Sequence, residues 1–245
     1  MRCQEMSKDS TIRCYDRQAD AYDLYQRAVV PEYDTALETT ALIVDRLLGK
    51  RPRVLDLGCG TGNASAAILR TSPGARIFLL DGSASMVAAA EAKVRSISPS
   101  SFLGSKVADL ASNGWDEGLA ASGFDAVVST LVMEHLDYDS YRAVLPSCFD
   151  LLSPGGWLLA VEGYAEEESD MLSWFEEMMD ERRSLIGEPD LSDFISKLRS
   201  EEEVHHYASK SQKADWWREA GFERVHLLWQ YLCIALMAGK RPPIR

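Results

Sequence analysis

The sequence predicts an α/β fold in which a mostly parallel β-sheet is covered by helices on both faces. Three observations lead to this prediction: short apolar runs alternate with segments of helical periodicity, a glycine-rich turn follows the first such run, and 46% of the 245 residues are hydrophobic. This alternation is typical of βαβ units, whose right-handed crossovers make the strands parallel. The chain can bury one substantial core, so we expect a single domain over residues 1–245.

The order of elements follows from the spacing of apolar residues. Residues 31–48 are predicted to form the first long helix, with Pro31 in its first turn and Gly49 as its stop. Five strands are predicted at 53–57, 76–80, 104–108, 124–129 and 156–162, and they alternate with helices at 62–71, 84–96, 113–121 and 139–152. Two final strands at 224–231 and 232–239 follow a helical insert at 165–220.

The most informative segment is the glycine-rich turn after the first predicted strand. Gly58, Gly60 and Gly62 lack Cβ atoms and permit the positive φ angles of a tight strand-to-helix turn, so a ligand can approach the backbone. A dinucleotide-binding turn would have its third glycine at position 63, which is Asn63. The carboxylate of Asp56 would also repel a pyrophosphate. The turn therefore favours a cationic nucleoside cofactor, S-adenosylmethionine.

A second acid supports this interpretation. Asp81 ends the second predicted strand, nineteen residues after Gly62. This is close to the spacing at which an acidic side chain accepts hydrogen bonds from a ribose. The sequence therefore predicts an adenosine-containing ligand at the carboxyl ends of the first two strands.

With these residues, the chain resembles the class I S-adenosylmethionine-dependent methyltransferases over most of its length. The pattern D-x-G-x-G-x-G appears at residues 56–62, and the family's acids after the second and third strands appear as Asp81 and Asp109. Residues 133–136 and 151–156 match later landmarks. The resemblance implies a Rossmann-like, doubly wound, seven-stranded sheet with one antiparallel strand and a helical cap after strand five. It also implies S-adenosyl-L-methionine as cofactor and S-adenosyl-L-homocysteine as product.

The resemblance and the chemistry together assign cofactor contacts at the carboxyl ends of the strands. We expect the glycine turn with Asp56 to hold the methionine moiety, Asp81 to bind the ribose, and Asp109 to face the adenine. The predicted cofactor-binding residues are Tyr22, Tyr33, Asp56, Gly58, Cys59, Gly60, Asp81, Gly82, Met86, Asp109, Leu110 and Ser129. For Met86 and Ser129, packing in the core is the alternative role.

The N-terminal segment, residues 1–50, is expected to cover the cofactor, as similar segments do in the resembled family. Tyr22 and Tyr33 are the candidates for a contact to the sulfonium, which an aromatic ring stabilises by about 0.5–2 kcal/mol. A buried packing role is the alternative for both tyrosines.

Methyl transfer from a sulfonium is an in-line displacement, and alignment alone can contribute about 7–11 kcal/mol. A base is needed only when the acceptor must lose a proton. His135 follows the fourth strand and is the predicted catalytic residue, with an architectural role as its alternative. Glu162, Tyr164 and Arg199 are the predicted substrate-binding residues, although Arg199 has a solvent-facing helix position as its alternative. The other histidines lack the spacing of metal ligands, and no metal is predicted.

Charge and composition narrow the function. The net charge is −12, and residues 162–203 hold fifteen acidic and four basic residues, which makes nucleic acid an unfavourable partner. The five dispersed cysteines indicate reduced thiols. With no apolar run of about twenty residues and a polar start, we expect a cytoplasmic protein with no membrane partner. A homodimer is compatible with the sequence.

These observations favour methyl transfer to a small-molecule acceptor, for example in secondary metabolism. One alternative is modification of the tRNA wobble uridine with carboxy-S-adenosylmethionine, because Arg199 is a positional match for an arginine that meets the added carboxylate in such relatives. Another is a cofactor-binding subunit without catalysis. Asn63 and Asp56 disfavour a nicotinamide oxidoreductase.

Overall fold

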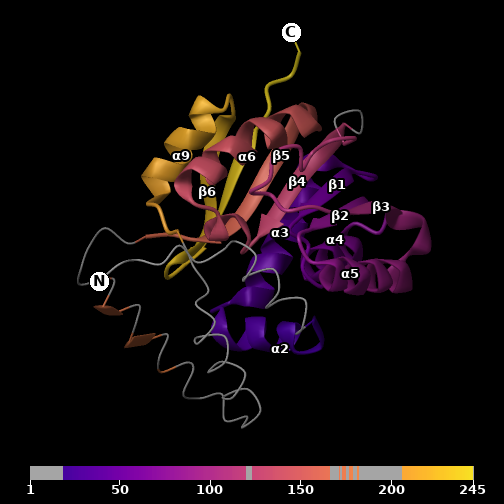
Figure 1. Cartoon of the computed structure of the whole chain (residues 1–245), viewed down its shortest axis with the longest axis horizontal. Coiled ribbons are helices and arrows are strands. Elements are labelled where there is room, and N and C mark those ends of the chain that lie inside the picture. The colour runs from indigo at the N-terminus through magenta and orange to yellow at the C-terminus, as the bar shows by residue number, and fades with distance from the viewer. Residues whose placement is uncertain are drawn as a thin grey trace.

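A seven-stranded β-sheet in the order β3-β2-β1-β4-β5-β7-β6 organises the protein. The computed structural model describes residues 19–119, 123–165 and 206–244, together with six single positions between 171 and 181 (Figure 1). The strands are β1 (Arg53–Leu57), β2 (Arg76–Asp81), β3 (Phe102–Val107), β4 (Phe124–Thr130), β5 (Leu152–Gly163), β6 (Glu223–Tyr231) and β7 (Ile234–Lys240). Strands β1 to β5 pair in parallel, and β7 is antiparallel to β5 and β6. The predicted Rossmann-like sheet with one antiparallel strand is confirmed.

Most of the described helices lie between strands, as the alternation of the sequence predicts, whereas two precede the first strand and the one at 19–29 was not predicted. They are α2 (Ala19–Val29), α3 (Tyr33–Leu48), α4 (Asn63–Thr71), α5 (Ala84–Ile97), α6 (Tyr138–Leu151) and α9 (Lys210–Glu219), with short 3-10 helices η1 (Pro99–Ser101) and η3 (Met133–His135). Ser83, Asp137 and Ser209 cap three of these helices, because each side chain accepts a hydrogen bond from the backbone N–H three residues further along. Each of these caps marks the residue at which a helix begins.

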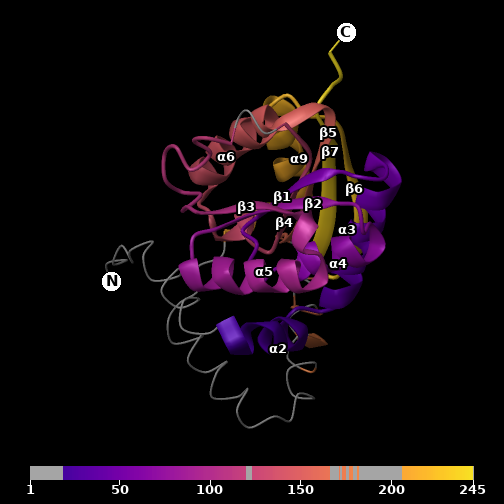
Figure 2. The same cartoon turned by 90° about the vertical axis from the view of Figure 1, so that its right-hand side faces the viewer.

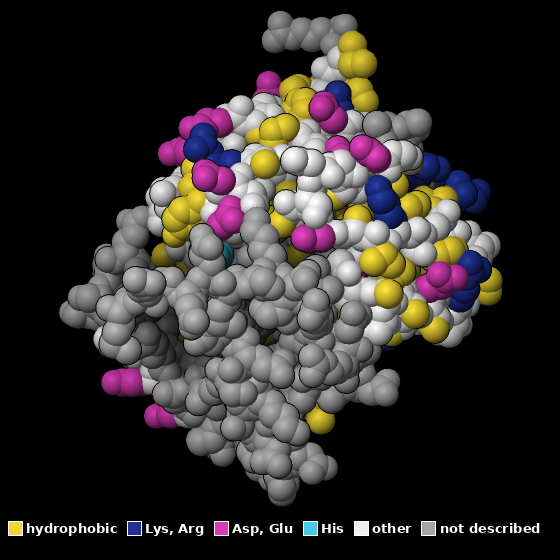
Figure 3. Space-filling view, in the orientation of Figure 1, with side chains coloured by type: hydrophobic (Ala, Val, Ile, Leu, Met, Phe, Trp, Pro, Cys, Tyr) yellow, Lys and Arg dark blue, Asp and Glu magenta, His cyan; other side chains and the backbone are white. Residues whose placement is uncertain are grey.

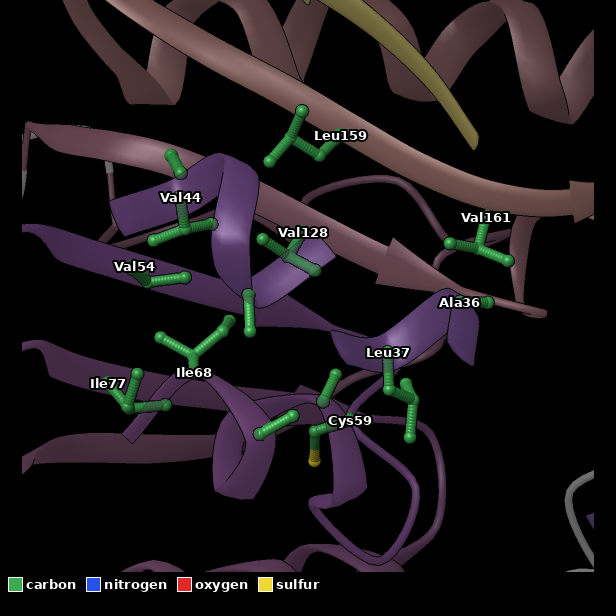
Figure 4. Packing of buried hydrophobic residues seen from close by; sticks show 14 of the residues in the cluster. Ala36, Leu37, Val44, Val54, Cys59, Ile68, Ile77, Val128, Leu159 and Val161 are labelled. Carbon is green, nitrogen blue, oxygen red and sulfur yellow. The ribbon is translucent and has the colours of Figure 1, made fainter. Parts of the chain in front are cut away.

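Helices cover both faces of the sheet and bury two apolar clusters. Helices α3, α4 and α5 lie on one face, and α6 and α9 lie on the other (Figure 2). On the first face, Leu37 and Val44 of α3 and Ile68 of α4 pack against residues of the central strands such as Val54 and Val128 (Figure 4). Strands buried on both faces must be apolar throughout, which explains why their sequences are nearly continuous hydrophobic runs.

The predicted helix at 113–121 is wrong over its described part, residues 113–119, which form consecutive turns. Gly114 and Gly118 have φ angles of 76° and 83°, which interrupt a right-handed helix. The backbone N–H of Leu119 donates to the carbonyl of Asp116 at 3.0 Å, which closes a four-residue turn. Trp115 and Leu119 are nevertheless buried, so apolar residues in a turn had produced the apparent helical pattern.

The predicted first long helix begins two residues later than expected. Glu32 has φ 55° and ψ 30°, a left-handed conformation that separates α2 from α3. The predicted insert at 165–220 contains α9, while residues 166–170 and 182–205 lie outside the described part. Within the described residues, no helix has the length and apolar character needed to cross a bilayer.

Candidate active site

The loop between β1 and α4 has the conformation that its glycines predict. Gly58, Gly60 and Gly62 have φ angles of 70°, 49° and 83°. The backbone N–H groups of Gly58 and Cys59 both donate to the carbonyl of Leu80 on β2, at 2.7 and 2.9 Å. The loop therefore folds across the ends of two adjacent strands, in a left-handed conformation that favours glycine.

Close packing around the loop gives a second reason for two of these glycines. A Cβ atom at Gly58 would lie 2.3 Å from Cγ1 of Val132, which follows β4. At Gly62, it would lie 3.0 Å from Cα and Cβ of Ala90 on α5. Neither position has room for a side chain unless its neighbour moves, so the loop is fixed against both the β4 segment and α5.

Asp81 joins this loop to the next one. Its Oδ2 atom accepts a hydrogen bond from the backbone N–H of Gly60 at 2.9 Å, and its Oδ1 atom accepts one from the N–H of Ser83 at 2.9 Å. Carboxylate oxygens can each accept a second bond, and Asp81 is only partly buried. The contact of Asp81 to a ribose hydroxyl stays a prediction.

Asp56 lies beneath the loop. Its side chain is 1% exposed, and its Oδ2 atom accepts hydrogen bonds from the backbone N–H and the hydroxyl of Ser65 on α4. Burial raises the pKa of Asp56 to about 6, although the hydrogen bonds from Ser65 oppose this change. The carboxylate therefore holds the first turn of α4, and its contact to a methionine moiety stays a prediction.

The remaining predicted contacts lie at the ends of β3 and β4 and at the start of α5. Asp109 accepts hydrogen bonds from the backbone N–H of Ala111 at 2.9 Å and from the hydroxyl of Ser112 at 3.3 Å. The other residues of this group are half-buried or buried: Cys59, Gly82, Met86, Leu110 and Ser129. Among the described residues, the buried hydroxyl of Ser129 finds no hydrogen-bond partner, which is consistent with a polar ligand group at this position.

The thiol of Cys59 is protonated at neutral pH. Burial raises its pKa well above the ordinary value, and the nearby Asp56 and Asp81 raise it further. Its small apolar side chain therefore serves the packing of the loop.

The two predicted tyrosines occupy different positions. The ring of Tyr22 on α2 lies over the glycine loop, since a Cβ atom at Gly60 would be 3.4 Å from Cε1 of Tyr22. Tyr33 is 6% exposed, and its hydroxyl accepts a hydrogen bond from the Nδ2 atom of Asn63 at 3.2 Å. Burial raises the pKa of Tyr33 to about 12. Tyr22 is therefore the better placed of the two to contact a ligand at the loop.

His135, the predicted catalytic residue, lies in η3 after β4 and is half-buried. Its neighbour Glu134 is 4% exposed, and the Glu134 carboxylate accepts a hydrogen bond from the backbone N–H of Gly163. Leu131, which begins this segment, has a φ angle of 55°, an uncommon conformation for a residue other than glycine. A strained backbone and a buried carboxylate thus hold the segment that carries His135.

Glu162, a predicted substrate residue, belongs to a buried polar network. Its carboxylate forms an ion pair with Lys213 of α9, and both side chains are 0% exposed. The Tyr141 hydroxyl donates to Oε1 of Glu162 at 3.0 Å, and Nε1 of Trp217 donates to the Tyr141 hydroxyl at 3.0 Å. Burial raises the pKa of Glu162, and the charge of Lys213 opposes that change. Contact with an acceptor would require this network to open.

Tyr164 adjoins the same network. It is 4% exposed, Nζ of Lys213 lies 4.7 Å from its ring centroid, and its hydroxyl has no hydrogen-bond partner among the described residues. Burial raises the pKa of Tyr164 well above its ordinary value, and Glu162 adds to the increase. Arg199, the third predicted substrate residue, lies outside the described residues.

The structure brings the predicted cofactor residues to one edge of the sheet, at the carboxyl ends of β1 to β4. Sequence reasoning missed four charged residues that support this region: Asp23, Lys93, Glu134 and Lys213. Each of them contacts a partner that is distant in the chain, and the spacing of residues in a sequence does not identify such a partner. Asp23 follows Tyr22 and Glu134 precedes His135, so a position beside a predicted site residue was the sequence signal that was available.

Comparison with known proteins supports the same assignment. Residues 55–158 match the methyltransferase domain. The chain is 28% identical to the carboxy-S-adenosyl-L-methionine synthase of Aeromonas salmonicida over 162 residues, 63% of this chain and 62% of that protein. It is 28% identical to the synthase of the same name from Shewanella amazonensis over 220 residues, 89% of this chain and 87% of that protein.

A similar fold occurs in the Burkholderia thailandensis 1,6-didemethyltoxoflavin-N1-methyltransferase, with a TM-score of 0.62 and 14% identity over 99% of this chain and 93% of that one. The strand order, the glycine loop and these similarities together define the class of protein. They support a class I S-adenosylmethionine-dependent methyltransferase whose cofactor is S-adenosyl-L-methionine.

Proposed function

We propose that this protein transfers the methyl group of S-adenosylmethionine to a small-molecule acceptor and releases S-adenosylhomocysteine. The observation that carries the proposal is the bridge made by Asp81 between the N–H of Gly60 and the N–H of Ser83, because it places a carboxylate where two ligand-binding loops meet. Asp56 beneath the same loop makes a phosphate an unfavourable ligand and suits a cofactor without one.

Each part of the site has a proposed task. When bound, S-adenosylmethionine supplies an electrophilic methyl group on a sulfonium. The glycine loop and Asp81 orient its methionine and ribose ends, and Tyr22 shields the loop from water. The hydroxyl of Ser129 provides a polar contact at the end of β4. His135 accepts a proton from acceptors that must lose one, and otherwise lines the site.

Two observations support a small acceptor over a nucleic acid. Acidic and basic side chains are interspersed with apolar ones on the described part of the face in Figure 3, and the whole chain carries a net charge of −12. The fold relative from B. thailandensis binds 1,6-didemethyltoxoflavin, a small molecule. A metabolite of secondary metabolism stays our prediction for the acceptor.

The curated relatives favour a second candidate, formation of carboxy-S-adenosylmethionine. The synthase from S. amazonensis aligns over 89% of this chain. In that case the cofactor itself would be the molecule that is modified, and the products would differ from those of methyl transfer. We rank methyl transfer first, because the match to the methyltransferase domain covers the glycine loop, β2 to β4 and most of β1.

Product analysis separates the two candidates. Purified protein is incubated with S-adenosylmethionine labelled in its methyl group, together with metabolite fractions or bulk tRNA, and all adenosyl compounds and acceptors are identified by mass spectrometry. Methyl transfer predicts S-adenosylhomocysteine in equal amount to a labelled small molecule. A carboxylated form of S-adenosylmethionine would support the second candidate, and label in tRNA would contradict a small-molecule acceptor.

A binding measurement tests the cofactor site itself. The substitution Asp81→Asn weakens the bond to a ribose, so we expect about a tenfold increase in the dissociation constant for S-adenosylhomocysteine, measured by calorimetry. Asp215→Asn is the matched control, because Asp215 is an exposed acid that pairs with Arg218 on α9. Equal affinity for both variants would show that Asp81 does not bind the ligand.

A further inference from the structure

Asp23 on α2 is held by side chains that come from two other parts of the chain. Its Oδ1 atom accepts hydrogen bonds from the Thr61 hydroxyl and from Nδ2 of Asn63, the latter at 2.9 Å, and its Oδ2 atom accepts one from Nζ of Lys93 at 2.8 Å. Lys93 also donates to Oδ1 of Asn63 at 2.7 Å. These four residues form a closed set, which we call the Asp23 latch.

The latch connects α2 to the glycine loop. Thr61 lies within the loop, Asn63 begins α4, and Lys93 lies on α5. Tyr22, the residue before Asp23, lies against Gly60 in the same loop. Helix α2 lies beyond α5, on the same side of the sheet (Figure 2). The latch therefore fixes the helix at the place where its tyrosine covers the loop.

Asn63 has a specific use in this arrangement. It stands where a dinucleotide-binding loop would have its third glycine, and it is 8% exposed. Its amide donates to Asp23 and to the hydroxyl of Tyr33, and its carbonyl accepts from Lys93. The residue that departs from the dinucleotide pattern is thus the residue that links α2 and α3 to the loop.

The ion pair of the Asp23 latch is partly exposed to water, and its carboxylate is stabilised in the charged form. The side chains of Lys93 and Asp23 are 28% and 33% exposed. Burial acts to raise the pKa of Asp23, but Lys93, Thr61 and Asn63 outweigh it and the pKa is lowered. The carboxylate is therefore charged at neutral pH while water still reaches it, which distinguishes it from a buried structural pair.

A second attachment of α2 involves Arg27, whose Nη1 atom also donates to the backbone carbonyl of Asp23 at 3.3 Å. A left-handed residue, Glu32, separates α2 from α3, with φ 55°. Nearby, Nε of Arg27 donates to both oxygens of Asp34 at 3.1 and 3.0 Å, and these side chains are 46% and 57% exposed. One pair thus joins α2 to α3, and the latch joins it to the cofactor loop.

We propose that Asp23 is a positioning residue for the cofactor: by holding α2 and Tyr22 on the glycine loop, it slows the release of S-adenosylmethionine and S-adenosylhomocysteine. The proposal rests on the cofactor site of the proposed function and is independent of the acceptor. Opening of the latch lets α2 move away from the loop, so that ligand exchange and latch opening are coupled.

The test measures ligand release in the full chain. S-adenosylhomocysteine is displaced by excess S-adenosylmethionine in a stopped-flow instrument, and hydrogen exchange of residues 19–29 is followed by mass spectrometry. For Asp23→Ala we expect the dissociation rate to rise about five- to thirtyfold, with faster exchange in α2. Asp23→Asn keeps an acceptor oxygen but loses the charge, and should give an intermediate rate.

Asp34→Ala is the matched control, because it breaks the pair between α2 and α3 without touching the loop. We expect its dissociation rate to stay within about twofold of the wild type. A folded Asp23→Ala variant with the wild-type rate, or an equal increase in Asp34→Ala, would overturn the proposal. Lys93→Met provides a second variant, with an increase in rate similar to that of Asp23→Ala.

Failure of this inference can be told apart from failure of the proposed function. Faster release from Asp23→Ala without any methylated acceptor supports the latch and counts against methyl transfer. Methyl transfer with unchanged release from Asp23→Ala overturns the latch alone. A wild-type protein that does not bind S-adenosylhomocysteine overturns both.

Discussion

The two polar networks around Lys93 and Lys213 use the same chemistry with different burial. In each, a lysine of one helix pairs with a carboxylate from another element and is held by neighbouring polar groups. The side chains of the first pair are 28% and 33% exposed, and those of the second pair, Lys213 and Glu162, are 0% exposed. The difference in burial therefore distinguishes the Lys93–Asp23 contact, which can open, from the Lys213–Glu162 contact, which stabilises the fold.

The buried network is a brace at the end of β5. Lys213 donates to Oε2 of Glu162 and to the carbonyl of Gly163, and the N–H of Gly163 donates to Glu134 beside His135. Charges removed from water are costly unless both partners are present, so loss of one partner is severe. The Asp23 latch, in contrast, exchanges bonds with water when it opens.

The largest expected effect is that of Lys213→Ala. It leaves the Glu162 carboxylate buried without its cation, and we expect the free energy of unfolding to fall by about 3–5 kcal/mol in urea titrations. The double variant Lys213→Met with Glu162→Leu removes both charges and should recover most of the loss. If Lys213→Ala lowered the free energy of unfolding by less than about 1 kcal/mol, the buried pair would contribute no more to stability than the partly exposed pair.

Asp56 extends the comparison, because it is a buried carboxylate that is held by the backbone N–H and the hydroxyl of Ser65. Its pKa is raised from 3.8 to about 6, so the folded state binds more protons than the unfolded state between these values. The stability from this residue is therefore full below about pH 4 and is lost as the pH rises towards about 6.

Asp56→Asn removes that titration. We expect the unfolding free energy of the wild type, relative to this variant, to fall by about 2 kcal/mol between pH 4 and pH 6, because each pKa unit corresponds to about 1.4 kcal/mol. Urea titrations at several pH values measure the difference. A difference that rises with pH would show that the pKa of Asp56 is lowered by folding.

A smaller effect is expected for Tyr141→Phe. The change removes the bonds to Glu162 and from Trp217, and leaves one buried acceptor and one buried donor without a partner. The expected loss in unfolding free energy is about 1–3 kcal/mol. The release rate of S-adenosylhomocysteine should not change, since the brace does not touch the glycine loop. Faster release would indicate that the two networks are coupled.

The smallest effect on stability is expected for Lys93→Ala. A partly exposed pair contributes about 0.2–1 kcal/mol, so the unfolding free energy should change by no more than this. The same variant should release S-adenosylhomocysteine faster than the wild type, which separates stability from ligand retention. A loss of several kcal/mol would place Lys93 with the buried networks.

The sheet could be predicted because its residues carry a local signal. Apolar runs such as residues 53–57 and 124–129 became β1 and β4, and the glycines at 58, 60 and 62 took the positive φ angles that their order suggested. The helix predicted at 113–121 was wrong over its described part, because buried apolar residues such as Trp115 also occur in turns. The periodicity of apolar residues indicates which side chains are buried. Whether the segment forms a helix or a series of turns depends on its backbone hydrogen bonds.

The networks could not be predicted in the same way. Asp23 and Lys93 are 70 positions apart, and Glu162 and Lys213 are 51 positions apart. Charged residues on amphipathic helices have no period that identifies a partner on another element. Glu162 was chosen as a substrate residue from its place at the carboxyl end of the fifth strand, but its burial with Lys213 appears only in the folded chain.

The sequence alone determined the class of fold and the cofactor type, and it predicted the edge of the sheet where we place the site, because glycine conformation, strand burial and an acid at a strand end depend on neighbouring residues. The tertiary structure decided which charges meet and how much water reaches them. Those properties arise from packing between distant elements, and they make Asp23 a latch and Lys213 a brace.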